Sequence, residues 1–344
     1  MKAPVFSTEQ GGLSLQERPS PPAPPPLYVK LRVAFVGICG TDFHILNGRH
    51  PHAQEPVILG HEISGTIVAV GECFRAEPGT AVVVNPYSSC GKCKLCNGLR
   101  SNCCEQLKVM GVHIDGGLCE EILVPFDRIY KLPGGLTLRA AAMIEILAVG
   151  HHAIGRSPLT HGNRVLVIGC GPAGLSIALP LRQRRYHVAL MDKSSERVAM
   201  AKERFQLEPV FEADGSVADA SKVNGPYDVV FDATGCAASA SNAFNNLLAH
   251  GGALVSVGIM TADLQVDAAE GHRREKSLLF TRNSTHNDFR EALRFAKENP
   301  DMVGNMVTTA TTLDEAALNI SGWASDNSGL LKGVVQIEPA AAQR

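Results

Sequence analysis

The spacing of hydrophobic and polar positions changes near residue 137 and divides the chain into two parts. In the first part, short apolar runs such as residues 62–71 and 81–84 are separated by prolines and glycines. Runs of this kind predict β-strands joined by turns. In the second part, near-continuous apolar runs alternate with helical segments. That alternation is typical of a parallel sheet covered by helices on both faces, so we expect an α/β protein with a β-rich, barrel-like first part.

Individual elements can be placed from the same pattern. In the second part we expect strands at residues 164–168, 187–192, 228–232 and 253–257, and helices at residues 138–154, 173–184, 195–205 and 238–249. In the first part, a strand is expected at residues 27–36, after a proline-rich surface loop at 19–26 that lacks backbone donors. The chain after about residue 288, with a last strand at 333–337, is expected to return to the first domain.

The composition is that of an ordinary globular protein. Its 344 residues are 45% hydrophobic and 19% charged, and the net charge of -2 offers no electrostatic footprint for nucleic acid or an anionic membrane. No apolar run approaches the roughly 20 residues of a membrane span, and residues 1–6 lack the apolar core of a signal peptide. We therefore expect a cytoplasmic protein whose ten cysteines are metal ligands and spare thiols rather than disulfides.

Four cysteines give a strong metal-binding signal. Cys90, Cys93 and Cys96 form two overlapping C-x-x-C steps, and Cys104 follows eight residues later. Four thiolates on a tight lobe, at about residues 86–108, suit a closed tetrahedral zinc site with a structural role. An iron–sulfur cluster is the alternative for such a set, and Cys103 is the alternative fourth ligand. The isolated cysteines are expected to act as small buried hydrophobic residues: Cys73, Cys119, Cys170 and Cys236.

A second group of metal-ligand types lies between residues 36 and 62. Cys39 offers a thiol, His61 an imidazole and Glu62 a carboxylate. One sulfur, one nitrogen and one oxygen suit zinc and leave a coordination position open for chemistry. The sequence therefore predicts a catalytic zinc site here.

A glycine motif predicts a dinucleotide site. Residues 169–174 match G-x-G-x-x-G, directly follow an apolar strand and open a helix. The backbone there can approach a pyrophosphate at the helix N-terminus, through Gly169, Gly171, Pro172, Ala173 and Gly174. Asp192 ends the next strand, where a carboxylate binds ribose hydroxyls and repels a 2′-phosphate, which favours NAD over NADP. Lys193 and Arg197 are assigned to the same cofactor site. Their positive charges would instead favour NADP, because they attract its 2′-phosphate.

These motifs occur in the order found in one known family. Residues 37–42, the Gly60-His61-Glu62 triplet, the four cysteines and the glycine motif together resemble the zinc-dependent medium-chain dehydrogenases, which include alcohol, polyol and threonine dehydrogenases. The resemblance covers essentially the whole chain.

The resemblance implies a particular domain organisation. A GroES-like catalytic domain, residues 1–147 plus 286–344, is interrupted by a Rossmann NAD-binding domain at residues 148–285, with the active site in the cleft between them. It also implies two zinc ions per subunit, one catalytic and one structural, and a homodimer or homotetramer. No nucleic acid or membrane partner is expected.

The resemblance assigns metal ligands position by position. Cys39 and His61 correspond to catalytic zinc ligands, and Glu62 follows His61 as it does in the family. Glu145 falls where alcohol dehydrogenases carry a third protein ligand, although Ile146 here replaces the proline that often follows in the polyol branch. A glutamate in so apolar a segment is costly to bury without a metal or a hydrogen-bond partner. Glu62 and Glu145 therefore compete for the third ligand position.

The resemblance also assigns the proton path. Thr41 corresponds to the hydroxyl that hydrogen-bonds the substrate oxygen, and His44 to the imidazole that passes the proton on to solvent. Asp42 is expected to support His61, as metal-bound imidazoles usually require. Lys332 falls where relatives place a basic residue near the cofactor pyrophosphate. In the implied reaction zinc lowers the pKa of the bound alcohol, and hydride passes to the nicotinamide.

Likeness at four short segments narrows the substrate class. Residues 102–104, 111–117, 272–275 and 282–283 look most like bacterial dehydrogenases that oxidise L-galactonate or L-gulonate at C5. A hexonate carries a carboxylate, which arginine matches with two hydrogen bonds. His113 and Arg282 are the substrate candidates, with Arg273 and Arg274 as further possibilities. The alternatives are a sorbitol- or threonine-dehydrogenase-like activity and a non-catalytic NAD-binding protein.

Overall fold

The computed structural model describes residues 1–9, 11–72, 76–213, 225–325 and 329–337. The chain divides into two units. Unit 1 comprises Met1–Glu145 and Thr285–Arg344, and unit 2 comprises Ile146–Ser284. These boundaries lie within two residues of the expected ones. Cys73 lies outside the described residues.

Unit 1 is built on a sheet of seven strands over the described residues. The order is β10-β6-β5-β3-β18-β17, and β9 pairs with β3. The strands of this sheet are β3 (Tyr28–Ile38), β5 (Glu62–Val70), β6 (Ala81–Val84), β9 (Glu121–Pro125), β10 (Ile129–Lys131), β17 (Thr309–Thr312) and β18 (Gly333–Gln336). Smaller sheets combine β1 (Lys2–Ser7), β2 (Gly12–Glu17) and β4 (Val57–Ile58), or β7 (Tyr87–Ser88) and β8 (Lys108–Val109).

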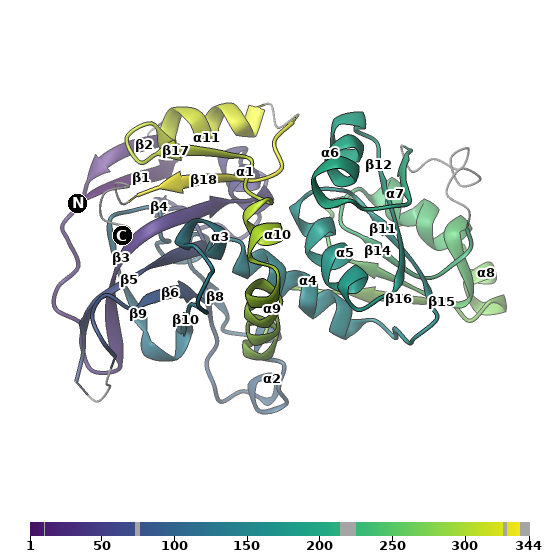
Figure 1. Cartoon of the computed structure of the whole chain (residues 1–344), viewed down its shortest axis with the longest axis horizontal. Helices are drawn as coiled ribbons and strands as arrows, with labels where there is room; N and C mark the ends of the chain where they lie inside the picture. The colour runs from purple at the N-terminus through teal and green to yellow at the C-terminus, as the bar shows by residue number, and fades with distance from the viewer. Residues whose placement is uncertain (10, 73–75, 214–224, 326–328, 338–344) are drawn as a thin grey trace. The chain divides into compact units, whose positions relative to one another are not determined.

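Short helices complete unit 1. They are α1 (Gly40–Leu46), α2 (Lys94–Asn97), η1 (Ser101–Cys103), η2 (Phe126–Arg128), α3 (Leu138–Ala141), α9 (His286–Glu298), α10 (Pro300–Gly304) and α11 (Ala316–Ser325). Strand β18 pairs antiparallel with β3, with Val335 opposite Val36. The purple N-terminal and yellow C-terminal strands therefore lie side by side (Figure 1), as expected for a chain that returns to its first domain.

Unit 2 is a parallel sheet of six strands over the described residues, in the order β13-β12-β11-β14-β15-β16. Its strands are β11 (Arg164–Ile168), β12 (His187–Asp192), β13 (Val210–Glu212), β14 (Tyr227–Asp232), β15 (Leu248–Ser256) and β16 (Ser277–Phe280). The helices are α5 (Pro172–Gln183), α6 (Ser195–Phe205), α7 (Ala237–Asn242), η4 (Ala243–Leu247) and α8 (Ala268–Arg273). The strand order reverses between β11 and β14, which is where this type of sheet binds dinucleotides.

Two predicted helices differ from the structure. The helix expected at 138–154 is interrupted after Ala141 and resumes as α4 (Ile144–Arg156). The helix expected at 238–249 ends in the π-turn η4, and strand β15 already begins at Leu248. Both segments are rich in alanine and contain leucine, and the local preferences of these residues do not specify where tertiary pairing ends a helix.

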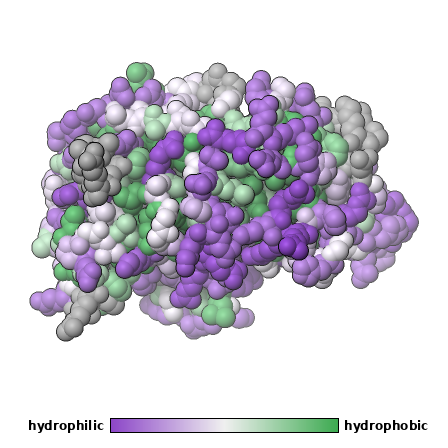
Figure 2. Space-filling model, in the orientation of Figure 1, coloured by the Kyte–Doolittle hydropathy of each residue, from purple (hydrophilic) through white to green (hydrophobic). Residues whose placement is uncertain are grey.

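Among the described residues, no helix combines the length and the hydrophobicity needed to cross a bilayer. On the face shown in Figure 2, hydrophobic and hydrophilic side chains are interspersed.

Candidate metal centre and cofactor site

Cys39 stands at the junction between β3 and α1. It is the N-cap of α1, and its sulfur accepts a hydrogen bond from the backbone N–H of Thr41 at 3.2 Å. In turn, the carboxylate of Asp42 accepts a hydrogen bond from the backbone N–H of Cys39 at 2.9 Å. This reciprocal capping arrangement fixes the thiol at the end of the strand.

Strand pairing brings His61 and Glu62 to Cys39. In the β3–β5 pair, Glu62 lies opposite Gly37, two residues before Cys39. Gly37 has to be small, because a Cβ there would come within 2.0 Å of the Glu62 carboxylate. The His61 Nε2 atom lies 2.9 Å from the Cys39 sulfur. A thiol and an imidazole that are 22 residues apart in the sequence thus meet at one point.

Two buried carboxylates lie beside His61, and each has a different partner. His61, Glu62 and Glu145 each place a ligand atom within 4.8 Å of the others. Both oxygens of Glu62 accept hydrogen bonds from Lys332 Nζ, at 2.6 and 2.8 Å. Glu145, on the first turn of α4, instead accepts a short hydrogen bond from the Tyr87 hydroxyl.

Lys332 has a buried partner that the sequence did not predict. Its side chain is 1% exposed, and its ammonium is bonded to the Glu62 carboxylate. The negative neighbours Glu62 and Cys39 outweigh burial, which alone would lower the pKa of Lys332, and raise that pKa. The contact with the cofactor pyrophosphate stays a prediction, and the contact that the structure shows for this ammonium is the Glu62 carboxylate.

The charge balance around His61 favours a bound cation. Asp42, Glu62 and Glu145 are all at most 3% exposed, and Lys332 is bonded to only one of them. Burial disfavours a charged imidazole, but Cys39 and Asp42 outweigh it and raise the pKa of His61 well above its usual value. Sulfur, nitrogen and oxygen donors in a negative environment fit a zinc ion.

Asp42 is placed to orient His61. The distance between His61 Nδ1 and Asp42 Oδ1 is 3.7 Å, and both atoms are buried. Within the described part of the chain, neither atom has a hydrogen-bond partner. A small closing movement would make this hydrogen bond and leave Nε2, which faces Cys39, as the metal-binding nitrogen.

The sulfur atoms of the four cysteines lie within 4.8 Å of one another and form a compact cage. The sulfur–sulfur distances are 3.5 Å for Cys93–Cys96, 3.9 Å for Cys93–Cys104 and 4.0 Å for Cys90–Cys96. A tetrahedral zinc ion with Zn–S bonds of about 2.3 Å holds its sulfurs about 3.8 Å apart. Backbone N–H groups of Lys92 and Cys93 lower the pKa of Cys90 to about 6, which favours the thiolate. A single ion fits this cage better than a larger iron–sulfur cluster.

The remaining cysteines differ in exposure. Cys103 lies outside the cage, 3.8 Å from the Arg100 guanidinium. Cys119 and Cys170 are buried as predicted, and burial raises the pKa of each to about 12. Cys236 is exposed, so the prediction of a buried hydrophobic role was wrong for this residue.

The glycine motif lies at the carboxyl end of β11, the central strand of unit 2. Gly174 has no room for a side chain, because a Cβ there would come within 1.8 Å of the Gly169 carbonyl oxygen. Asp192 ends β12, and its carboxylate accepts from the backbone N–H groups of Cys170 at 2.7 Å and Ser194 at 2.9 Å. The carboxylate therefore holds the glycine loop directly. A Cβ at Gly171 would lie 3.4 Å from the Arg197 guanidinium, which places a positive charge beside that loop.

The other predicted site residues are placed as follows. Thr41 and His44 are partly buried on α1, next to Cys39. His113, in unit 1, accepts a hydrogen bond at Nδ1 from the backbone N–H of Val109. Arg282, in unit 2, is exposed, as is Lys193.

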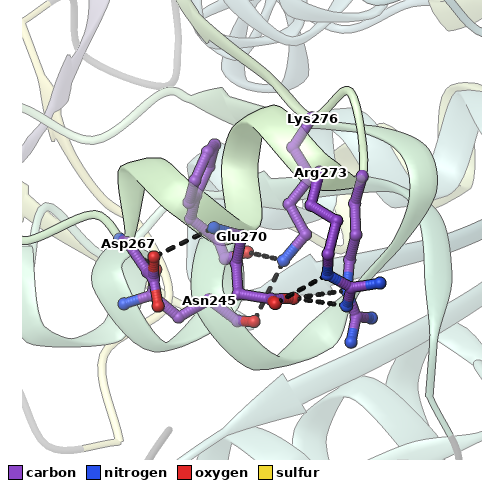
Figure 3. Close-up of polar contacts among 7 residues, drawn as sticks. Asn245, Asp267, Glu270, Arg273 and Lys276 are labelled. Carbon is purple, nitrogen blue, oxygen red and sulfur yellow. Dashed lines mark hydrogen bonds and ion pairs between the residues drawn. The ribbon is translucent and has the colours of Figure 1, made fainter.

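Arg273 and Arg274 are engaged within unit 2. Both donate to the Glu270 carboxylate, at 2.8 Å and 2.7 Å, on and just after helix α8 (Figure 3). The two arginines lower the pKa of Glu270 to about 2. They thus belong to an exposed ion-pair network centred on Glu270. The backbone N–H of Glu270 in turn donates to Asp267, the N-cap residue of α8. An exposed structural role for the arginines is favoured over a carboxylate-binding one.

Comparison with known proteins identifies the family. Residues 25–134 match the alcohol dehydrogenase GroES-like domain, and residues 160–298 match the zinc-binding dehydrogenase domain. L-galactonate-5-dehydrogenase of Escherichia coli (strain K12) is 35% identical over 89% of this chain and 90% of its own length. Sorbitol dehydrogenase of Halalkalibacterium halodurans is 31% identical over 89% of this chain and 90% of its own.

A solved structure of an alcohol dehydrogenase is also similar to this chain. The short chain alcohol dehydrogenase rspB from E. coli CFT073, complexed with the cofactor NADH, is similar with a TM-score of 0.88 and 28% identity, over 98% of this chain and 99% of that one. This chain belongs to the zinc-dependent medium-chain alcohol and polyol dehydrogenases. Unit 1 is its GroES-like domain and unit 2 its Rossmann-like domain, and the protein is an oxidoreductase that acts on CH–OH donors with zinc and a nicotinamide dinucleotide. The predicted family, fold class and enzyme type are confirmed, which rules against a non-catalytic protein.

The buried ion pair predicts a stability effect. Replacing Lys332→Met leaves the Glu62 carboxylate buried without its partner, which costs about 3–5 kcal/mol in the free energy of unfolding. The double variant Glu62→Gln/Lys332→Met removes both charges and is expected to recover most of that loss. Urea unfolding of the zinc-loaded protein measures both values. A single variant within about 1 kcal/mol of the wild type would contradict the pairing, because such a loss is typical of an exposed ion pair.

Proposed function

We propose that Cys39, His61 and Glu145 hold the catalytic zinc, and that Cys90, Cys93, Cys96 and Cys104 hold a structural one. The choice of Glu145 over Glu62 rests on their partners. Lys332 neutralises Glu62 at both oxygens, whereas the neutral Tyr87 hydroxyl bonds to a single oxygen of Glu145. Glu145 is therefore not paired with a cation, and its second oxygen is left for the metal.

The reaction proposed is oxidation of a secondary alcohol with transfer of hydride to NAD. Zinc in this site supplies Lewis-acid polarisation of the substrate hydroxyl. Thr41, beside Cys39, accepts the hydroxyl proton as its own hydroxyl proton leaves toward His44, and His44, near the other end of α1, passes a proton on to solvent. The Gly169–Gly174 loop and Asp192 bind the cofactor, with Arg197 beside the phosphates.

The substrate class proposed is a polyol or sugar acid, with L-galactonate or L-gulonate oxidised at C5. Support comes from the relative named L-galactonate-5-dehydrogenase, which is similar over 89% of this chain. His113 and Arg282 are the candidates for contacting the substrate. A sorbitol- or threonine-dehydrogenase-like activity is the second candidate, and the relative named sorbitol dehydrogenase favours its sorbitol form.

A substrate screen tests this proposal. NAD reduction by the purified zinc-loaded protein is measured on L-galactonate, L-gulonate, sorbitol and L-threonine, and kcat/KM is expected to be highest on a hexonate. Cys39→Ser should lower turnover about a thousandfold or more, because zinc polarisation supplies several kcal/mol, while NAD binding by calorimetry is retained. Cys236→Ser, the same change at an exposed thiol, is the matched control. Turnover of sorbitol without any hexonate activity would refute the sugar-acid assignment.

Cofactor choice provides a separate prediction. Asp192→Ala removes the negative charge that repels a 2′-phosphate, so the ratio of kcat/KM with NAD to that with NADP should fall roughly tenfold or more, equivalent to about 1.4 kcal/mol. Because Asp192 also holds the glycine loop, Asp192→Asn serves as a second variant that keeps an acceptor oxygen. A wild-type enzyme that already prefers NADP would contradict the proposed use of NAD.

We also propose that the protein forms a homodimer or homotetramer. Strand β16 is an edge of the unit 2 sheet, and its Phe280 is 57% exposed. An edge strand with an exposed aromatic residue is suited to pairing with a second copy. Phe280→Lys should shift the mass measured by analytical ultracentrifugation from oligomer to smaller species. A wild-type protein that is monomeric at micromolar concentration would refute the assembly.

A further inference from the structure

We propose that Tyr87 is a positioning residue for the catalytic metal, because its hydroxyl holds one oxygen of Glu145 and directs the other toward the ligand site. This inference rests on the proposed function, in which Glu145 is a metal ligand. Tyr87 is contributed by strand β7 and Glu145 by helix α4, which are 58 residues apart in the sequence. Their side chains meet in a fully enclosed contact.

The Tyr87 ring is fixed on several sides. Its side chain is buried, with the residue 6% exposed. Its backbone N–H donates to the side-chain oxygen of Asn85 at 3.0 Å, and β7 pairs with β8 so that Tyr87 lies opposite Val109. The ring meets Phe289 of α9 edge to face, with centroids 6.5 Å apart. Because the phenol is packed in this way, its hydroxyl stays bonded to Glu145 and does not turn toward water. It therefore holds the carboxylate in one orientation.

The hydroxyl is suited to hold Glu145 without neutralising it. The Tyr87 hydroxyl is a neutral donor that bonds to one oxygen of Glu145. Hydrogen bonds from a hydroxyl to a carboxylate are short and strong. The contrast with Glu62 is direct, since Glu62 faces a full positive charge on Lys332. The two carboxylates beside His61 thus differ in charge compensation, and only Glu145 retains an uncompensated oxygen.

The strand that carries Tyr87 also leads into the cysteine cage. Cys90 follows Tyr87 by three residues, and strand β8, which pairs with β7, begins four residues after Cys104. Both sides of the Tyr87 hairpin are therefore anchored at the four cysteines. A structural ion in that cage would fix the position of the Tyr87 hydroxyl relative to Glu145.

The test uses Tyr87→Phe, which deletes only the hydroxyl. Tyr130→Phe is the matched control, because Tyr130 stacks on the same Phe289 at 5.4 Å but bonds to His286 rather than to Glu145. In each variant the catalytic site is loaded with Co²⁺, and its visible absorption spectrum and its metal affinity by chelator competition are recorded. Thermal unfolding and the zinc content of the cysteine cage report on folding.

Tyr87→Phe is expected to weaken metal binding at the catalytic site about 10- to 100-fold, the usual effect of losing a group that orients a ligand, and to shift the Co²⁺ spectrum. The zinc of the cysteine cage should be retained. Tyr130→Phe should leave metal affinity and spectrum unchanged. A Tyr87→Phe variant with wild-type affinity and spectrum would overturn the proposal.

Glu145→Gln separates this inference from the ligand assignment on which it rests. In the Glu145→Gln background, removal of the Tyr87 hydroxyl should have no further effect on Co²⁺ affinity, because the two residues act as one unit. An equal loss in both backgrounds would show that Tyr87 acts elsewhere and would refute positioning while leaving Glu145 a ligand. If Glu145→Gln itself leaves affinity and spectrum unchanged, the ligand assignment fails, and the inference fails with it.

Discussion

Buried negative charge around His61 is the constraint on which unit 1 depends. Asp42 and Glu62 are fully buried and Glu145 is nearly so, and an uncompensated buried ion costs several kcal/mol. Each carboxylate therefore needs its own partner. Asp42 accepts from the backbone at the start of α1, Glu62 from Lys332 and Glu145 from Tyr87. The charge that these contacts do not neutralise is what makes the site attract a metal.

This constraint accounts for the discontinuous chain of unit 1. Lys332 directly precedes β18, and the pairing of β18 with β3 delivers its ammonium to Glu62 on β5. The partner of a carboxylate near the N-terminal end is thus supplied from 270 residues later. If unit 1 consisted only of its first segment, the Glu62 carboxylate would have no cationic partner. The segment that follows unit 2 therefore supplies both the Lys332 ammonium and the last strands of the sheet.

The sequence predicts local features of this molecule far better than distant ones. The cysteine cage and the glycine loop are encoded by short spacings, so their residues could be named from the sequence. The four cysteine sulfurs lie close together in the structure. The Lys332–Glu62 pair could not be found, because a lysine is ordinarily a surface residue and nothing local marks its partner. Tyr87 was missed for a similar reason, since a tyrosine in a two-residue strand looks like part of the core. The residues that decide between the two candidate ligands contact partners that are far away in the sequence.

The cysteine cage gains a physical role from this arrangement. A closed four-thiolate site does no chemistry of its own, and its loop lies at the surface, with Cys90, Cys93 and Cys96 only partly buried. Yet the two strands that leave the cage, β7 and β8, frame Tyr87. Short two-residue strands are weak elements by themselves, so they need an anchor if the Tyr87 hydroxyl is to remain at Glu145. A metal ion held by the four cysteines would supply that anchor, and it would link the two proposed metal sites through the Tyr87 hydroxyl.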